Sequence, residues 1–304
     1  MSKRAPLLLL LLASGAVWAQ SRTMGMIHQG RGRLALDQLL PKLETAPLDP
    51  GLNAQAGLAY HAMGRYADAL GYLAYAEGSE IYPQVGVARE AEGLRATGQA
   101  QAAIALHTER LWQSPDERRQ LQVWLNLLQD HRSAGEPQRA LDAGYMALSL
   151  SPRSATVHAW MAEIHLDQGD VELARESLYM ADSLPADPAN RLLLARARLA
   201  IAEGDLESAQ ALVSAARENR RWLADNVAMQ CEIFLAQDDP GAVLDLLDKS
   251  LVMHRQDPVL LAQRARAFQA LGAQADATYA MHQLQLLSPG FPLRPFAVPG
   301  LTPD

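Results

Sequence analysis

Glycines recur along this chain at a nearly constant spacing, and that spacing limits what the chain can fold into. The intervals are 34, 37, 34, 35, 34 and 34 residues, with one aspartate in the series. The members are Gly64, Gly98, Gly135, Gly169, Gly204, Asp238 and Gly272. Glycine at a helix end readily adopts the left-handed conformation that lets the chain reverse. A period of this length predicts a stack of similar helical units.

Two columns of small residues keep the same phase. When Pro50 is numbered as place 1 of the first unit, the recurring glycine holds place 15. Place 20 holds Ala69, Ala103, Ala140, Ala174, Ala209, Val243 and Ala277. Place 8 holds Gly57, Ala91, Leu128, Ala162, Ala197, Cys231 and Ala265. Small side chains at these places would let the two antiparallel helices of a unit cross closely.

One complete unit can be followed from Asn53 to Ala76. Its places 8, 11, 15, 17, 20 and 27 hold Gly57, Tyr60, Gly64, Tyr66, Ala69 and Ala76. This pattern resembles the tetratricopeptide repeat (TPR), a helix-turn-helix unit of about 34 residues. The resemblance implies an all-α, right-handed superhelical solenoid, similar to exported bacterial members of the family. It also implies a binding scaffold, and no residue in the pattern identifies the partner.

The pattern divides the chain into repeated units and flanking segments. Seven units are expected at residues 50–83, 84–117, 121–154, 155–188, 190–223, 224–257 and 258–291. Residues 20–49 are expected to form an N-terminal capping helix, because Gly30 keeps the phase and leucines follow it at helical spacing. Pro41 is expected to interrupt or kink that helix. Together these elements predict about fifteen helices.

Two regions depart from the pattern. The sixth unit has Asp-Asp-Pro at residues 238–240 and Val243 at place 20, which indicates either an altered helix angle or a recognition feature. Residues 292–304 are too rich in proline for a helix. This proline-rich tail is interpreted either as a flexible end or as a segment that packs along the last helix or docks on a partner.

The first residues have the character of a secretory signal peptide, Met1 to Ala19. Lys3 and Arg4 precede a leucine run, and small residues follow, so cleavage would leave Gln20 as the N-terminus. The leucine run is shorter than the ~20 residues of a membrane span. The only cysteine is Cys231, so no cysteine follows the signal to carry a lipid. A soluble periplasmic or secreted protein is expected.

The charge balance argues against nucleic acid as a partner. The whole chain has a formal net charge of −7, and loss of the two basic residues in the signal lowers it to −9. Nucleic-acid-binding domains usually carry a basic patch that neutralises phosphates. This acidic balance also separates the chain from RNA-reading helical repeats of similar period.

The histidines, the cysteine and the glycines carry no recognisable catalytic motif. The eight histidines show no HExxH or paired ligand spacing. His131 and His165 both hold place 11, where other units have aromatic rings, so they are interpreted as packed rings. There is no phosphate-binding glycine loop and no nucleophile elbow. The sequence therefore predicts neither an enzyme nor a metal or cofactor site.

In the family that this chain resembles, partners usually bind a concave face built by the first helix of each unit, through places 2, 5, 9, 12 and 13. Place 5 is apolar and is expected to form the floor of a groove, and place 9 carries long polar groups of both signs. The candidate binding residues are Glu92, Arg95, Gln129, Arg132, Glu163, Arg198, Glu232 and Arg266. Alternatively, members of the row pair with one another, as Arg198 and Glu232 could. Reversal of Arg198 and Arg266 to Glu is expected to weaken capture without changing stability.

Three functions fit these features. The first is an exported, non-enzymatic scaffold that binds a protein or peptide in the groove and helps assemble an envelope machine such as a pilus, a secretion apparatus or an exopolysaccharide exporter. The second is a periplasmic peptide-binding chaperone or maturation factor. The third is an enzyme subunit whose chemistry the sequence hides. The lysine and asparagine that clamp a partner's carboxylate in chaperone-adaptor members are absent from places 5 and 9, so that function is not inferred.

Overall fold

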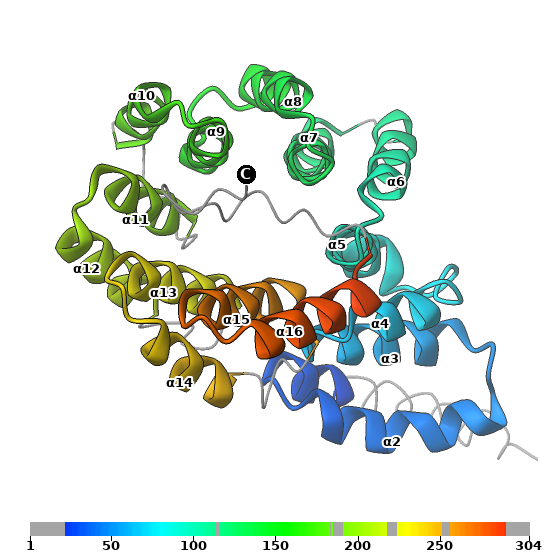
Figure 1. Cartoon of the computed structure of the whole chain (residues 1–304). Coiled ribbons are helices and arrows are strands. Elements are labelled where there is room, and N and C mark those ends of the chain that lie inside the picture. The colour runs from blue at the N-terminus through cyan, green and yellow to red at the C-terminus, as the bar shows by residue number, and fades with distance from the viewer. Residues whose placement is uncertain are drawn as a thin grey trace, which may run out of the picture. The chain divides into compact units, whose positions relative to one another are not determined.

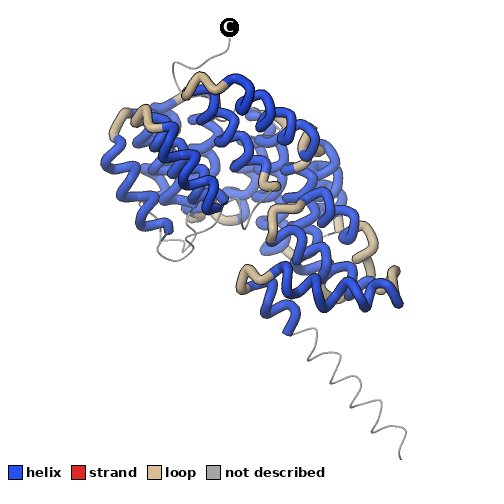
Figure 2. Tube along the Cα trace, turned by 60° about the horizontal axis from the view of Figure 1, so that its bottom comes forward, coloured by secondary structure: helices blue, strands red, loops and turns tan. Residues whose placement is uncertain are grey.

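The computed structural model describes residues 22–113, 116–182, 184, 191–217, 224–250 and 256–289. Over these ranges the chain is built of helices joined by short turns, and it contains no strand (Figure 2). The predicted signal peptide and the proline-rich tail lie outside them. The chain divides into two compact units, Met1–Gly93 and Leu94–Asp304, which we call the N-terminal and C-terminal units. None of the described helices has the length and apolar character needed to cross a bilayer.

The N-terminal unit consists of short helices packed in sequence order. Their bounds are α2 Gly32–Thr45, α3 Pro50–Ala62, α4 Tyr66–Leu73 and the π-helix Tyr82–Gly86, followed by α5 Val87–Ala96, which continues into the C-terminal unit. Asp49 caps α3 by accepting a hydrogen bond from the backbone N–H of Leu52 at 2.8 Å. At Gly57 an added Cβ would lie 2.7 Å from Cγ of Leu73, so the small residue at place 8 is required for α3 and α4 to pack.

The segment expected to be one capping helix contains two helical stretches. Residues 22–28 are helical, Gly30 has φ of 72°, and α2 follows. Ala35 is fully buried 34 residues before Ala69, so it holds place 20 of an additional helix pair. The expected interruption at Pro41 is wrong, since α2 continues to Thr45. Leucines on both sides of the proline, Leu36, Leu39 and Leu43, are buried in one core, which holds the helix together across it.

The C-terminal unit stacks helix pairs of similar length. Their bounds are α6 Ala100–Trp112, α7 Glu117–Ser133, α8 Pro137–Leu150, α9 Ala155–Gln168, α10 Val171–Asp182, α11 Arg191–Glu203, α12 Leu206–Arg217, α13 Ala224–Ala236, α14 Pro240–Ser250, α15 Pro258–Ala270 and α16 Gln274–Leu287. Figure 1 shows the first helices of successive pairs, α7, α9 and α11, in an inner layer, with the second helices α8, α10 and α12 outside them. Side chains of successive first helices are therefore brought next to one another.

The predicted columns of residues are confirmed. Every glycine at place 15 has a φ between 70° and 82°, and Asp238 in the sixth unit has a φ of 58°. The place 20 residues are at most 2% exposed, including Val243, so each lies between the helices of its pair. The turn and the close helix crossing thus explain why these two columns are glycine and alanine.

The last helix of the C-terminal unit meets its first residues. The hydroxyl of Ser288, directly after α16, donates to the backbone carbonyl of Ala96 at the end of α5. Ser288 and the adjacent Thr97 are both buried. This hydrogen bond ties together two segments that are 192 residues apart in the sequence.

Candidate binding surface on the first helices

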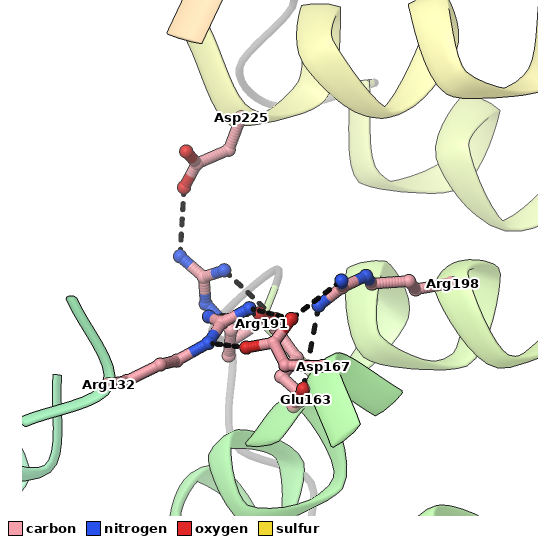
Figure 3. Close-up of polar contacts among 6 residues, drawn as sticks. All are labelled: Arg132, Glu163, Asp167, Arg191, Arg198 and Asp225. Carbon is pink, nitrogen blue, oxygen red and sulfur yellow. Dashed lines mark hydrogen bonds and ion pairs between the residues drawn. The ribbon is translucent and has the colours of Figure 1, made fainter. Parts of the chain in front are cut away.

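A network of ion pairs joins the first helices of the C-terminal unit, centred on one turn of α9 (Figure 3). Glu163 accepts hydrogen bonds from Arg132 at 2.6 Å and from Arg191 at 3.0 Å. Asp167, one helical turn later, accepts from Arg132 and lies 2.7 Å from Arg198. The arginines come from α7 on one side and α11 on the other, because equivalent places of stacked units are adjacent.

The network extends to α13 and includes an aromatic ring. Arg191 uses its second terminal nitrogen to bind Asp225 at 2.8 Å. The centroid of the Trp160 ring on α9 lies 4.0 Å from the guanidinium carbon of Arg191 and 5.6 Å from the guanidinium carbon of Arg132. Both distances fall within the range of cation–π attraction. The ring therefore helps to hold both arginines beside Glu163.

Glu163 is ionised in this setting. Its burial alone would raise the pKa, but the guanidinium groups of Arg132, Arg191 and Arg198 together lower the pKa to about 2. The pKa of Arg132 is correspondingly raised by Glu163 and Asp167, despite its burial. A buried carboxylate satisfied by two guanidinium hydrogen bonds is a structural element, and a partner could reach it only by breaking those bonds.

The row continues differently towards α15. Glu232 on α13 makes no hydrogen bond or ion pair with any side chain in the described ranges. Burial raises its pKa, although Arg198 and Arg266 act in the opposite direction. Arg266 donates to the side-chain oxygen of Gln263 at 3.1 Å, and burial lowers the pKa of its guanidinium. This end of the row therefore holds a half-buried carboxylate whose oxygens are open to a new donor.

The remaining predicted residues are not part of one continuous row. Arg95 pairs with Asp130, which is completely buried and also bonded to His107. Gln129 donates to a backbone carbonyl of its own helix. Glu92 belongs to the N-terminal unit and contacts Arg89 and His61 there. The structure thus brings together Arg132, Glu163, Arg198, Glu232 and Arg266. Arg95 forms a separate pair with Asp130 of α7, and Gln129 and Glu92 have other partners.

Two further expectations need correction. The apolar floor expected at place 5 is largely covered, because five of its seven members belong to the packed interior and are at most 6% exposed, whereas Leu125 is half-buried and Ala88 is exposed. The five buried members are Ala54, Ala159, Leu194, Ala228 and Ala262. The alternative in which Arg198 pairs with Glu232 is also modified, since Arg198 forms its ion pair with Asp167 at 2.7 Å and acts on Glu232 only by lowering the pKa of that carboxyl.

Four residues of the network were not predicted from the sequence: Trp160, Asp167, Arg191 and Asp225. The last three hold places 13, 2 and 2, which belong to the face expected to bind partners. Asp167 pairs with places 12 and 9 of the units before and after it, and Arg191 pairs with place 9 of the unit before it and place 2 of the unit after it. Opposite charges at these places of successive units were therefore an available signal.

The described residues hold neither a ligand set for a metal ion nor an activated thiol. Among them, no three His, Cys, Asp or Glu residues are grouped as ligands for a metal ion. Burial raises the pKa of the Cys231 thiol to about 12, so the thiolate needed for nucleophilic attack is disfavoured.

Comparisons with known proteins bear on the fold. No protein-family model matches the chain, and no curated protein matches it. Among solved structures, it is similar to the apo form of the quorum sensor NprR from B. thuringiensis, with 14% identity, 89% of this chain and 86% of that chain covered, and a TM-score of 0.51. It is also similar to a tetratricopeptide repeat protein from Parabacteroides merdae, with 13% identity and a TM-score of 0.49. That match covers 77% of this chain and 91% of the other. A third similar structure is a thermophilic TPR protein from Thermus thermophilus, with 21% identity and a TM-score of 0.48. That match covers 62% of this chain and 99% of the other.

The fold follows from the repeated helix pairs, the left-handed turn at place 15 and the buried small residues at place 20. The chain therefore has the fold of a tetratricopeptide-repeat solenoid.

Proposed function

We propose that this protein is a non-enzymatic, protein-binding scaffold of the bacterial periplasm that helps to assemble an envelope machine such as a pilus, a secretion apparatus or an exopolysaccharide exporter. The observation that carries the proposal is the row of charged side chains of both signs on α7, α9, α11, α13 and α15. The export step rests on the basic, leucine-rich and small-residue segments at residues 1–19.

Within this row, the partner contacts the end formed by Glu232 and Arg266. The ion pairs around Glu163 are already satisfied, so binding there would first cost their separation. At Glu232, a partner's backbone N–H or side-chain amide would supply the hydrogen bond that the carboxylate lacks. A half-buried acceptor gains more from such a bond than an exposed one, because it has already lost part of its hydration. An extended or helical segment of a protein fits a surface that crosses several parallel helices.

The test uses the mature chain as bait in envelope extract at low salt. Glu232→Gln replaces one acceptor oxygen by a donor amide. Glu207→Gln is the control, because it makes the same change at an exposed residue of α12. We expect a protein captured by the wild type and by the Glu207 variant to be lost from the Glu232 variant. Equal capture by all three chains would contradict the assignment of this surface.

The identity of what is captured separates scaffold from chaperone. A scaffold retains one envelope component in fixed ratio, whereas a chaperone or maturation factor retains many unfolded clients. Mass spectrometry of the exported protein tests the location, since a chain beginning at Gln20 without added acyl mass is expected. A mass that retains residues 1–19 would contradict export by signal cleavage.

A further inference from the structure

The outer helices α8 and α10 expose the same pair of apolar side chains, one unit apart. Tyr145 and Met146 on α8 are 57% and 46% exposed, and Tyr179 and Met180 on α10 are 74% and 47% exposed. They hold places 25 and 26 of successive units, and both helices pack against α9. We call these four residues the Tyr-Met patch.

The solenoid does not need apolar residues at these places. Four of the five other units have no large apolar side chain at places 25 and 26, and the first unit has Tyr75 at place 26. The pairs are Ala74-Tyr75, Thr108-Glu109, Ser214-Ala215, Asp248-Lys249 and His282-Gln283. The interior of α8 and α10 is supplied instead by residues such as Ala147 and Leu178, which are buried. Large, exposed apolar side chains that lie outside the core clusters and recur at equivalent places of neighbouring units are typical of a protein interface.

The charge around the patch is negative. One turn before each tyrosine lies an exposed carboxylate, Asp142 on α8 and Glu176 on α10. In the part of the chain that the structure describes, neither carboxylate forms an ion pair. The two nearby arginines form ion pairs with other carboxylates. A terminal nitrogen of Arg139 lies 3.3 Å from a carboxylate oxygen of Glu136, and Arg175 pairs with both Glu172 and Glu203.

We propose that the Tyr-Met patch binds a basic amphipathic segment of a partner protein, with apolar side chains on the tyrosines and methionines and Lys or Arg beside Asp142 and Glu176. Methionine adapts to irregular apolar surfaces, and tyrosine combines a large ring with a polar end. The two carboxylates select a cationic segment and fix its orientation.

The same charges argue against two other occupants. Two copies of this chain joined through the patch would bring like carboxylates together, and an anionic membrane surface would be repelled by them. The patch lies on second helices, whereas the row of the proposed function lies on first helices. It would therefore give the scaffold a second binding surface, independent of the first.

The experiment measures fluorescence anisotropy of a labelled synthetic helix of leucine and lysine, titrated with the mature chain at low salt. The same helix with glutamate in place of lysine serves as the charge control. We expect the lysine peptide to bind, and the double variant Tyr145→Ser/Tyr179→Ser to bind it about tenfold more weakly. Asp142→Lys/Glu176→Lys should weaken it by a similar factor, and the effect should shrink with salt.

Matched controls keep the result specific. Tyr279→Ser/Leu286→Ser removes two side chains that are 65% and 70% exposed on α16, and it should leave the affinity within about twofold. All substituted residues are exposed, so circular dichroism should be unchanged. The proposal is overturned if the glutamate peptide binds equally well, or if the α16 variant loses as much affinity. Self-association of the wild type that disappears in Tyr145→Ser/Tyr179→Ser would also overturn it, in favour of a second copy.

Discussion

The α9 and α13 regions of the charged row carry the same side chain at the same place of their units, yet in opposite electrostatic states. Glu163 is held by Arg132 and Arg191, and its pKa is lowered to about 2 despite its burial. Glu232 lacks such bonds within the described residues, and burial raises its pKa. The fold supplies the position, while residues on the two neighbouring helices decide whether the carboxylate is a structural ion or an acceptor for a partner.

The different neighbours explain this contrast. Beside Glu163, α7 and α11 each direct an arginine to the carboxylate. Beside Glu232, Arg198 is directed to Asp167 and Arg266 to Gln263. The first carboxylate is therefore fixed by ion pairs between three helices, and the second is the one to which the proposed function assigns a partner contact.

The largest expected effect is loss of stability on removing Glu163. Glu163→Ala leaves two half-buried guanidinium groups with one carboxylate each, Asp167 for Arg132 and Asp225 for Arg191. The cost should therefore be about 3 kcal/mol, the lower end of the range for breaking a buried ion pair. A urea titration of the variant should show an earlier transition than the wild type. A midpoint equal to that of the wild type would mean that the ion pairs contribute nothing to the stack.

A pH series sharpens the same comparison. The folded pKa of Glu163, about 2, lies below its ordinary value of 4.5, so its stabilisation is complete above pH 4.5 and is lost as the pH falls towards 2. The difference in unfolding free energy between wild type and Glu163→Gln should therefore shrink over that window. A constant difference from pH 6 to about pH 2.5 would contradict the assigned ionisation.

The next effect tests the packing that both regions share. Ala174 is fully buried between α9 and α10, so Ala174→Leu should force the pair apart and cost about 1 to 3 kcal/mol. Ala102→Leu makes the same change on an exposed face of α6 and should be nearly neutral. Equal melting temperatures for the two variants would show that place 20 does not set the helix crossing.

These results separate what the sequence can predict from what it cannot. Places 8, 15 and 20 are set by backbone geometry, so residue type alone revealed them, and even Asp238 keeps the left-handed turn. Side chains at place 9 depend on which long groups of two neighbouring helices meet, and that is decided by rotamers and by residues at places 2 and 13. Place 9 alone therefore does not distinguish Glu163 from Glu232, and the difference lies at place 2 of the following unit, which is Arg191 in one case and Val259 in the other.

Because the sequence did not reveal the ion pair of Arg198, the charge-reversal test expected from the sequence must be reinterpreted. Arg198→Glu would place a carboxylate where the guanidinium now lies 2.7 Å from Asp167. Loss of that pair would lower stability together with binding, so the Arg198/Arg266 double variant does not isolate a binding surface.

A smaller effect is expected at the turn before α14. Asp238 has a φ of 58°, which costs a non-glycine residue about 1 kcal/mol, so Asp238→Gly should stabilise the protein by up to that amount. Asp239→Gly is the matched control, because the Asp239 carboxylate accepts from the N–H of Ala242 and its loss should destabilise slightly. Thermal melting of both variants decides this, and a lower melting temperature for Asp238→Gly would contradict it.

The smallest effect is expected at Glu232, and its sign is opposite to that at Glu163. Because the folded pKa of Glu232 is raised, the ionised group lowers stability as the pH rises through that pKa, and no penalty remains below the ordinary value. Glu232→Gln should therefore be as stable as the wild type at acidic pH and equal or slightly more stable at neutral pH, within about 1 kcal/mol. Chemical unfolding at pH 4 and pH 7 measures both. If the variant is clearly less stable at pH 7, Glu232 belongs to the structural ion pairs, and the loss of capture in the same variant would no longer identify a binding surface.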